Sequence, residues 1–377
     1  MTSSYLCLRP LGDPFHPVVK LSGSSQTSVP CFVGMQSGRP ENVETSIPPP
    51  SVMIHPLRFH PIFKERVWGG RRLEELFGKK LPPSVPIGES WEITDRPEGV
   101  SVIANGPLAG KDLRWLMEQH SHELLGPVRS RNGRFPLLVK ILDAREKLSL
   151  QVHPPARVAA ELGGEPKTEM WYIADAQAGA ELYVGLRRGV TRTEFERRIT
   201  QGTVADCFHR VGVRPGDVMF LPSGRVHAIG AGIVIFEIQQ NSDTTYRVFD
   251  WNRAGLDGKP RPLHVALSLQ CIDFDDFEPA LTAGQHQNCA DATCQCRALV
   301  DDPLFAADHL RVTQGEYLDT RGENPEIWGV LEGRIAVDQG NDQIEFRAGE
   351  FCLKPAVIEH MRLRFRPPVG LLRVRLR

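Results

Sequence analysis

Residues 214–222 read Arg-Pro-Gly-Asp-Val-Met-Phe-Leu-Pro, and His227 follows five residues after the closing proline. A Pro-Gly-Asp turn ahead of an apolar run is typical of a β-strand that begins at a tight turn. A related stretch, Arg-Ala-Gly-Glu-Phe-Cys-Leu-Lys-Pro, occupies residues 347–355, and His360 again follows five residues later. This similarity predicts that the chain contains one β unit twice.

Short runs with strand character fill the chain from residue 54 onward. The expected strands are Ser101–Ala104, Leu137–Leu142, Leu148–His153, Glu169–Ala174, Glu181–Leu186, Asp217–Leu221, Ile233–Gln239, Glu326–Val337, Gln343–Phe346, Phe351–Lys354 and Met361–Phe365. Many short strands separated by Gly and Pro predict an antiparallel barrel or sandwich. Helices are expected only at Lys111–Leu125, Pro155–Leu162 and Thr191–Thr200.

Composition narrows the class of protein. The 377 residues are 41% hydrophobic and 24% charged, with 45 Lys and Arg against 46 Asp and Glu. These values are ordinary for a globular protein and exclude fibrous or wholly disordered chains. The net charge of −1 gives no basis for binding nucleic acid or an anionic membrane, and no apolar run approaches the ~18 residues of a membrane span. We therefore expect a cytoplasmic protein without nucleic-acid or membrane partners.

The chain is predicted to divide into four segments. Sixteen of the first 50 residues are Ser or Pro, so residues 1–53 are expected to be a disordered extension or to lie upstream of the true start. Residues 54–280 form the first expected domain, and residues 301–377 form the second. The Gln-, His- and Cys-rich residues 281–300 are expected to be a linker, because their three cysteines lack a fourth partner at zinc-finger spacing.

Polar side chains of the first expected domain combine into a candidate metal site. Gln151 and His153 share one face of a strand, because strand residues two apart point the same way. The same rule places Lys167 and Glu169 on one face of another strand, and His227 follows the Pro-Gly-Asp turn. An amide, a carboxylate and two imidazoles supply the mixed N and O donors that suit Zn²⁺ or a similar ion. Each residue also has an ordinary interpretation when it is considered alone: His153 as a strand histidine, Glu169 as a surface carboxylate and His227 as a turn residue.

These motifs resemble those of a known family. The Pro-Gly-Asp turn with His227 and the glycines at 224 and 230 resembles the second sequence motif of a cupin barrel. Five stretches narrow the resemblance to the short-chain branch of the type I mannose-6-phosphate isomerases: Trp68–Gly70, Gly88–Glu92, Gln151–Pro154, Lys167–Met170 and Asn241–Arg247. The resemblance covers residues 54–377, without the large helical insertion of longer family members.

The resemblance implies both a fold and an activity. The fold is mostly β, with two cupin-type antiparallel β-barrels (jelly rolls) and a few short helices, and residues 54–280 form the catalytic domain. The activity is the reversible aldose–ketose isomerisation of mannose 6-phosphate and fructose 6-phosphate through a zinc-stabilised cis-enediol. One Zn²⁺ per chain is held by Gln151, His153, Glu169 and His227. The C-terminal domain offers no evident ligand partner for its histidine at 360, so we expect it to be a metal-free cupin.

Two cations are implied to act in catalysis and in substrate binding. Arg247 stays protonated, so it is an electrostatic or phosphate-binding group, unless it only pairs with Asp243. Lys167 could carry a proton if its pKa is lowered, bind phosphate, or be a solvated strand lysine, and zinc-bound hydroxide is a competing base. Asp243 and Glu237 are expected to contact the substrate, and Glu237 shares a polar strand face with Gln239.

Two alternative functions stay open on the sequence. A metal-dependent cupin dioxygenase would use two histidines and a carboxylate for O₂ chemistry, and it would not need Lys167 or Arg247. A non-catalytic cupin that senses or stores sugar would need no polarising metal. Apart from a small phosphorylated sugar we expect no partner, and we expect a monomer or a weak homo-oligomer.

Overall fold

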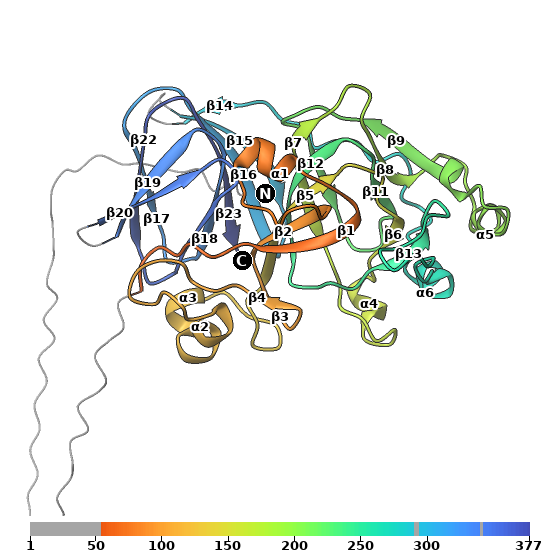
Figure 1. The fold of residues 1–377 in the computed structure, drawn as a ribbon, viewed down its shortest axis with the longest axis horizontal. Coiled ribbons are helices and arrows are strands. Elements are labelled where there is room, and N and C mark those ends of the chain that lie inside the picture. The colour runs from red at the N-terminus through yellow and green to blue at the C-terminus, as the bar shows by residue number, and fades with distance from the viewer. Residues whose placement is uncertain (1–53, 290–293, 340–341) are drawn as a thin grey trace, which may run out of the picture. The chain divides into compact units, whose positions relative to one another are not determined.

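A computed structural model describes residues 54–289, 294–339 and 342–377 (Figure 1). Strands dominate these residues and helices are few and short, which confirms the predicted mostly β class. The prediction of a disordered extension or an upstream start concerns residues 1–53, which lie outside the described ones. Among the described residues, no helix is both long and apolar enough to cross a membrane.

Two antiparallel sheets, which we call the first sheet pair, form the N-terminal part of the described chain (Figure 1). The larger sheet has the strand order β1 (Ile62–Gly70), β2 (Ile87–Ile93), β5 (Leu137–Ala144), β12 (Ile233–Gln240), β7 (Glu169–Ala176) and β10 (Val218–Leu221). The smaller sheet has the order β13 (Tyr246–Phe249), β6 (Leu150–Val152), β11 (His227–Ile229), β8 (Glu181–Leu186) and β9 (Phe208–Gly212). Leu142 and Ile173 of the larger sheet share a buried cluster with Leu182 and Ile229 of the smaller one, so the sheets pack face to face.

The C-terminal part repeats this arrangement in a second sheet pair. Its larger sheet has the order β14 (Gln287–Asn288), β15 (Cys294–Asp301), β16 (Phe305–Val312), β23 (Val369–Leu376), β18 (Glu326–Glu332) and β21 (Phe351–Lys354). Its smaller sheet has the order β17 (Tyr317–Arg321), β22 (His360–Phe365), β19 (Arg334–Gln339) and β20 (Asp342–Arg347). The two related sequence stretches end in β10 and β21, each the last strand of its larger sheet, and His227 and His360 begin β11 and β22. The predicted repeat of one β unit is therefore confirmed.

The prediction of a linker at 281–300 is wrong for part of that segment. It contains β14 and most of β15, because Cys294 and its neighbours on the same strand face pack into the core of the second sheet pair. The two larger sheets also share one buried cluster, in which the rings of Phe236 and Phe351 lie 5.4 Å apart between centroids. The division into domains at 54–280 and 301–377, and the closure of each sheet pair into a barrel, stay predictions.

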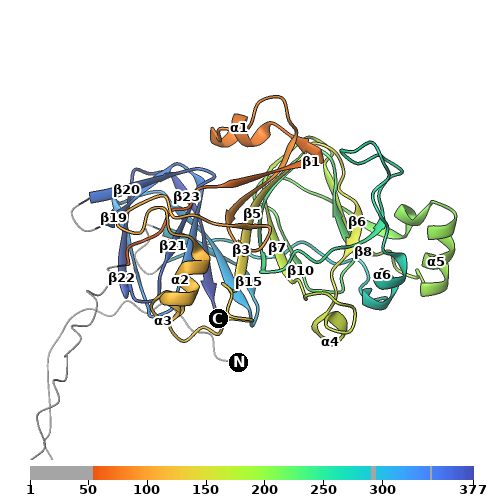
Figure 2. The same ribbon diagram turned by 60° about the horizontal axis from the view of Figure 1, so that its bottom comes forward.

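Short elements fill the connections. They are the helices α1 (Arg72–Phe77), α2 (Leu113–Gln119), α3 (Ser121–Leu125), α4 (Ala156–Ala159), α5 (Arg192–Thr200) and α6 (Val265–Cys271), and the two-stranded ladder of β3 (Asp95–Arg96) and β4 (Gly99–Val100). Figure 2 shows α5 and α6 beside β6 and β8, with which they share a buried cluster. The single helix expected at Lys111–Leu125 is two helices, because His120 leaves the helical conformation at φ −140°. The strand expected at Ser101–Ala104 forms only isolated bridges, from Ile103 to Phe59 and from Val102 to Asp112, and no continuous ladder.

Candidate active site

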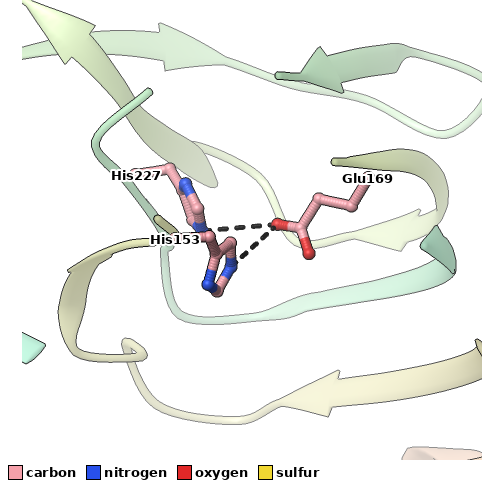
Figure 3. Close-up of side chains that lie close together, drawn as sticks. All are labelled: His153, Glu169 and His227. Atoms are coloured by element: carbon pink, nitrogen blue, oxygen red, sulfur yellow. Dashed lines mark ion pairs between the residues drawn. The ribbon is translucent and has the colours of Figure 1, made fainter. Parts of the chain in front are cut away.

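Three predicted metal ligands meet between the two sheets of the first sheet pair (Figure 3). His153 directly follows β6, Glu169 is the first residue of β7, and His227 is the first residue of β11. One ligand atom of each residue lies within 4.8 Å of the others, and all three side chains are buried. Glu169 Oε1 lies 3.6 Å from His153 Nε2 and 3.3 Å from His227 Nε2. Donor atoms from three separate segments therefore surround one point.

Gln151 reaches the same point from β6. It lies directly opposite His227 of β11 in the antiparallel register. The side-chain nitrogen Nε2 of Gln151 is 3.3 Å from Nε2 of the His227 ring. All four predicted ligands are therefore brought together.

Backbone carbonyls fix the orientation of both histidines. His153 Nδ1 donates a hydrogen bond to the carbonyl of Thr244 at 2.8 Å, and His227 Nδ1 donates one to the carbonyl of Arg225 at 2.9 Å. Because a carbonyl oxygen only accepts, Nδ1 carries the proton in each ring and Nε2 keeps its lone pair. Burial lowers the pKa of both rings, that of His227 to about 3. Both imidazoles are thus neutral at pH 7, which is the form that binds metals.

The carboxylate of Glu169 completes a donor set that fits a divalent cation. It is fully buried, and its Oε1 faces the Nε2 atoms of the two histidines. Burying a carboxylate is costly unless positive charge compensates it. One carboxylate, one amide and two neutral imidazoles are the borderline N and O donors that suit zinc.

Lys167 supplies a positive charge beside this donor set. Its Nζ lies 2.6 Å from Glu169 Oε2 and 3.2 Å from His153 Nε2. Burial disfavours the charged lysine, but the carboxylates of Glu169 and Glu237 outweigh burial, so the pKa of Lys167 is raised. The alternative of a solvated strand lysine is wrong, because the side chain is buried. In this arrangement Lys167 is an ammonium group, and its pKa is not lowered as a proton carrier at neutral pH would require.

A cavity of about 520 Å³ adjoins the donor set. The predicted residues that line it are Gln151, Lys167, Glu237, Asp243 and Arg247. Gln239, which was expected to share the polar face of Glu237, does not line it. Its side chain is held by backbone carbonyls, since Nε2 donates to those of Gln240 and Ser242 at 2.9 and 2.6 Å. The cavity thus gathers all the residues that were expected to contact substrate.

Arg247 forms part of the cavity wall. Its Nη1 donates to the carbonyl of Pro262 at 2.8 Å. The alternative role, an ion pair with Asp243, is wrong: Asp243 instead lies 3.7 Å from the ammonium of Lys140. Burial and the nearby Arg261 lower the pKa of Arg247, yet a guanidinium stays charged at neutral pH. Among the residues that the structure describes, this cation has no ion-pair partner, so its charge is available to a ligand.

Comparison with known proteins decides the family. Residues 57–195 match the catalytic domain of type I phosphomannose isomerases. The probable mannose-6-phosphate isomerase GmuF of Bacillus subtilis (strain 168) is 44% identical over 307 residues, which cover 81% of this chain and 94% of that protein. This chain belongs to the type I phosphomannose isomerase family.

Two further similarities agree with the family. The mannose-6-phosphate isomerase ManA of Bacillus subtilis (strain 168) is 38% identical over 303 residues, which cover 80% of this chain and 93% of that protein. The crystal structure of the mannose 6-phosphate isomerase from Bacillus subtilis superposes with a TM-score of 0.76 at 31% identity, and it covers 85% of this chain and 99% of that one. The predicted family is confirmed, and it favours an isomerase over a dioxygenase or a non-catalytic cupin.

One charged network in this phosphomannose isomerase site was not predicted from the sequence. Lys140 of β5 lies 3.5 Å from Glu237, 3.6 Å from Glu89 and 3.7 Å from Asp243. Arg66 pairs with Glu89 at 2.7 Å. Burial opposes ionisation of Glu89, but Lys140 and Arg66 outweigh it and lower the pKa of Glu89 to about 2. The available signal was Lys140 itself, one of only two charged residues, with Asp143, in an otherwise apolar strand.

Proposed function

We propose that this chain interconverts mannose 6-phosphate and fructose 6-phosphate with one bound zinc ion. The residues that would hold the ion are Gln151, His153, Glu169 and His227. The observation that carries the proposal is that these donors converge next to a cavity with Lys167 and Arg247 in its wall. The substrate is supported by the relatives, which are 44% and 38% identical and are named as mannose-6-phosphate isomerases.

The cavity suits a sugar phosphate in size and charge. Its volume of about 520 Å³ lies in the range of small-molecule sites, roughly 300–1,000 Å³. The carboxylates of Glu237 and Asp243 are acceptors for sugar hydroxyl groups. Arg247, whose charge is not used by another side chain, binds the phosphate or stabilises negative charge that develops on the sugar oxygens.

The isomerisation moves a proton between C1 and C2 of the sugar, and negative charge develops on oxygen. Zinc, when bound, supplies Lewis-acid stabilisation of that charge. Lys167 adds a second positive charge at the same end of the cavity and holds one oxygen of Glu169. The two buried histidines stay neutral, so they act as ligands and not as acids.

A coupled assay tests this function. Purified chain is mixed with mannose 6-phosphate, and fructose 6-phosphate is detected through a coupling enzyme. We expect turnover that a chelator abolishes and that added zinc restores, with unphosphorylated mannose as the matched control that reacts far more slowly. Turnover that survives complete removal of metal would contradict the zinc proposal, and no turnover of the zinc-loaded chain would contradict the isomerase proposal.

A further inference from the structure

Two equivalent strands, one in each sheet pair, begin with the motif Glu-x-Trp. Residues Glu169–Trp171 begin β7, and residues Glu326–Trp328 begin β18. β7 and β18 hold the fifth position in their six-stranded sheets, between equivalent neighbours. Both tryptophans are almost completely buried. Trp171 and Trp328 are therefore equivalent residues of the repeated unit.

The two indole groups donate to different carboxylates. Trp328 Nε1 donates to Glu326 Oε2 at 3.0 Å, within its own motif. Trp171 Nε1 donates instead to Glu237 Oε1 at 3.0 Å, across to the neighbouring strand β12. The residue opposite Trp328 on β23 is Arg373, and an arginine has no acceptor atom. The residue on the neighbouring strand thus decides which carboxylate the indole contacts.

This choice of partner changes the state of the motif glutamate. Glu326 Oε2 accepts from Trp328 and also from the Thr320 hydroxyl at 2.6 Å. Glu169, its equivalent, receives no indole N–H: its Oε2 contacts the Lys167 ammonium at 2.6 Å, and its Oε1 faces the two histidines. In the first sheet pair one oxygen of the glutamate, Oε1, is therefore left to the metal donor set.

We propose that Trp171 is a positioning residue of the isomerase site. Its N–H sets the orientation of the Glu237 carboxylate in the cavity, and its ring supports His227. The ring lines the cavity and meets the His227 imidazole edge to face, with centroids 5.3 Å apart. Because Lys140 lies 3.5 Å from the other oxygen of Glu237, both oxygens have a partner and the carboxylate plane is fixed. The inference rests on the proposed isomerase function.

The first test is a pair of matched substitutions. Trp171→Phe removes the N–H and keeps an aromatic ring, and Trp328→Phe makes the same change at the equivalent position outside the site. We expect Trp171→Phe to lower kcat about tenfold with little change in KM, because a lost hydrogen bond to a charged group acts on the oriented carboxylate. Zinc content should remain at one per chain. Trp328→Phe should leave kcat and zinc content unchanged.

A double-mutant cycle separates positioning from a structural role. In a Glu237→Met background, which has no acceptor for the indole, we expect Trp171→Phe to change kcat by less than about twofold. In a Glu237→Gln background, which keeps an acceptor, Trp171→Phe should again lower kcat. Equal, multiplicative effects in all backgrounds would overturn the proposal. A wild-type kcat for Trp171→Phe, or loss of its zinc, would do the same.

Zinc binding gives a readout that does not need activity or a folded Trp171→Phe variant. With Glu237→Met the indole is free to donate to Glu169, as Trp328 donates to Glu326, so we expect zinc affinity to fall about tenfold. With Glu237→Gln the affinity should match the wild-type chain. Equal zinc affinity of the two variants would overturn the proposal. Inactivity of the zinc-loaded wild-type chain would instead refute the isomerase function, so the two failures are distinct.

Discussion

Lys167 Nζ lies 2.6 Å from Glu169 Oε2, while the other oxygen of Glu169 faces the two histidines. One buried carboxylate thus contacts a cation of the chain on one side and the metal donor set on the other. Because the ammonium is not itself one of the donors, its charge can be removed without removing a ligand. A substitution of Lys167 can therefore test the role of its charge in the reaction while every proposed metal ligand stays in place.

The first prediction concerns that ammonium group. Lys167→Met keeps the length of the side chain and removes its charge, so we expect zinc content to remain at one per chain and kcat to fall about a hundredfold or more. The measurement is zinc content by mass spectrometry together with steady-state kinetics. Lys80→Met, at an exposed lysine, is the control and should behave as wild type. Unchanged kcat for Lys167→Met would refute its role in the reaction.

The second prediction uses the two equivalent histidines. His227→Ala removes a proposed ligand, and we expect about hundredfold weaker zinc affinity and a comparable loss of turnover. His360→Ala is the matched control, because His360 begins the equivalent strand but is largely exposed beside Asp319. It should retain zinc affinity and turnover. Similar zinc affinity of the two variants would show that His227 is not a ligand.

Turn motifs and strand alternation selected the four proposed ligands as candidate donors, and the family resemblance assigned them to one zinc ion. Each lies in or beside a strand of the first sheet pair, where period two and turn residues decide which way a side chain points. The fold class and the repeated unit were predictable for the same reason. Turn residues and strand alternation are local signals, so they can be recognised without knowing the order of the strands in a sheet.

Contacts between strands were not predictable. The contacts of Lys140 with Glu89 and of Trp171 with Glu237 depend on β2, β5, β12 and β7 being neighbours, and this order is not the order of the sequence. Polar composition also gave a wrong prediction for part of 281–300, where β14 and β15 are stabilised by pairing in the second sheet pair rather than by their own sequence. Tertiary packing therefore determined the strands at 281–300 and the contacts between neighbouring strands, which the local sequence pattern did not specify.

The third prediction concerns acid stability. The pKa of Glu89 is lowered from the model-compound value of 4.5 to about 2 by Lys140 and Arg66, against the effect of burial. Its ionised form therefore stabilises the fold above pH 4.5, and this stabilisation is lost as the pH falls from 4.5 toward 2. We expect Glu89→Gln to lower Tm at pH 7 and to flatten the fall of Tm between pH 5 and pH 3. Glu196→Gln, in an exposed pair with Arg192, should leave the profile unchanged, and an equally steep profile for Glu89→Gln would contradict the prediction.

The fourth prediction concerns the core that the two sheet pairs share. Phe351 of β21 packs against Phe236 of β12 in this core. Phe351→Ala should reduce the free energy of unfolding by about 3–5 kcal/mol, and the residues from 54 onward should still unfold in one transition. Calorimetry and near-ultraviolet circular dichroism measure both quantities. Two separated transitions in the wild-type chain would show that the sheet pairs are independent domains.

Anomalous diffraction at the zinc absorption edge, from crystals of the zinc-loaded chain, tests the central proposal most directly. We predict one anomalous peak per chain, within bonding distance of side-chain donors of Gln151, His153, Glu169 and His227. A peak at another place, or none at this point in a chain that turns over mannose 6-phosphate, would contradict the account.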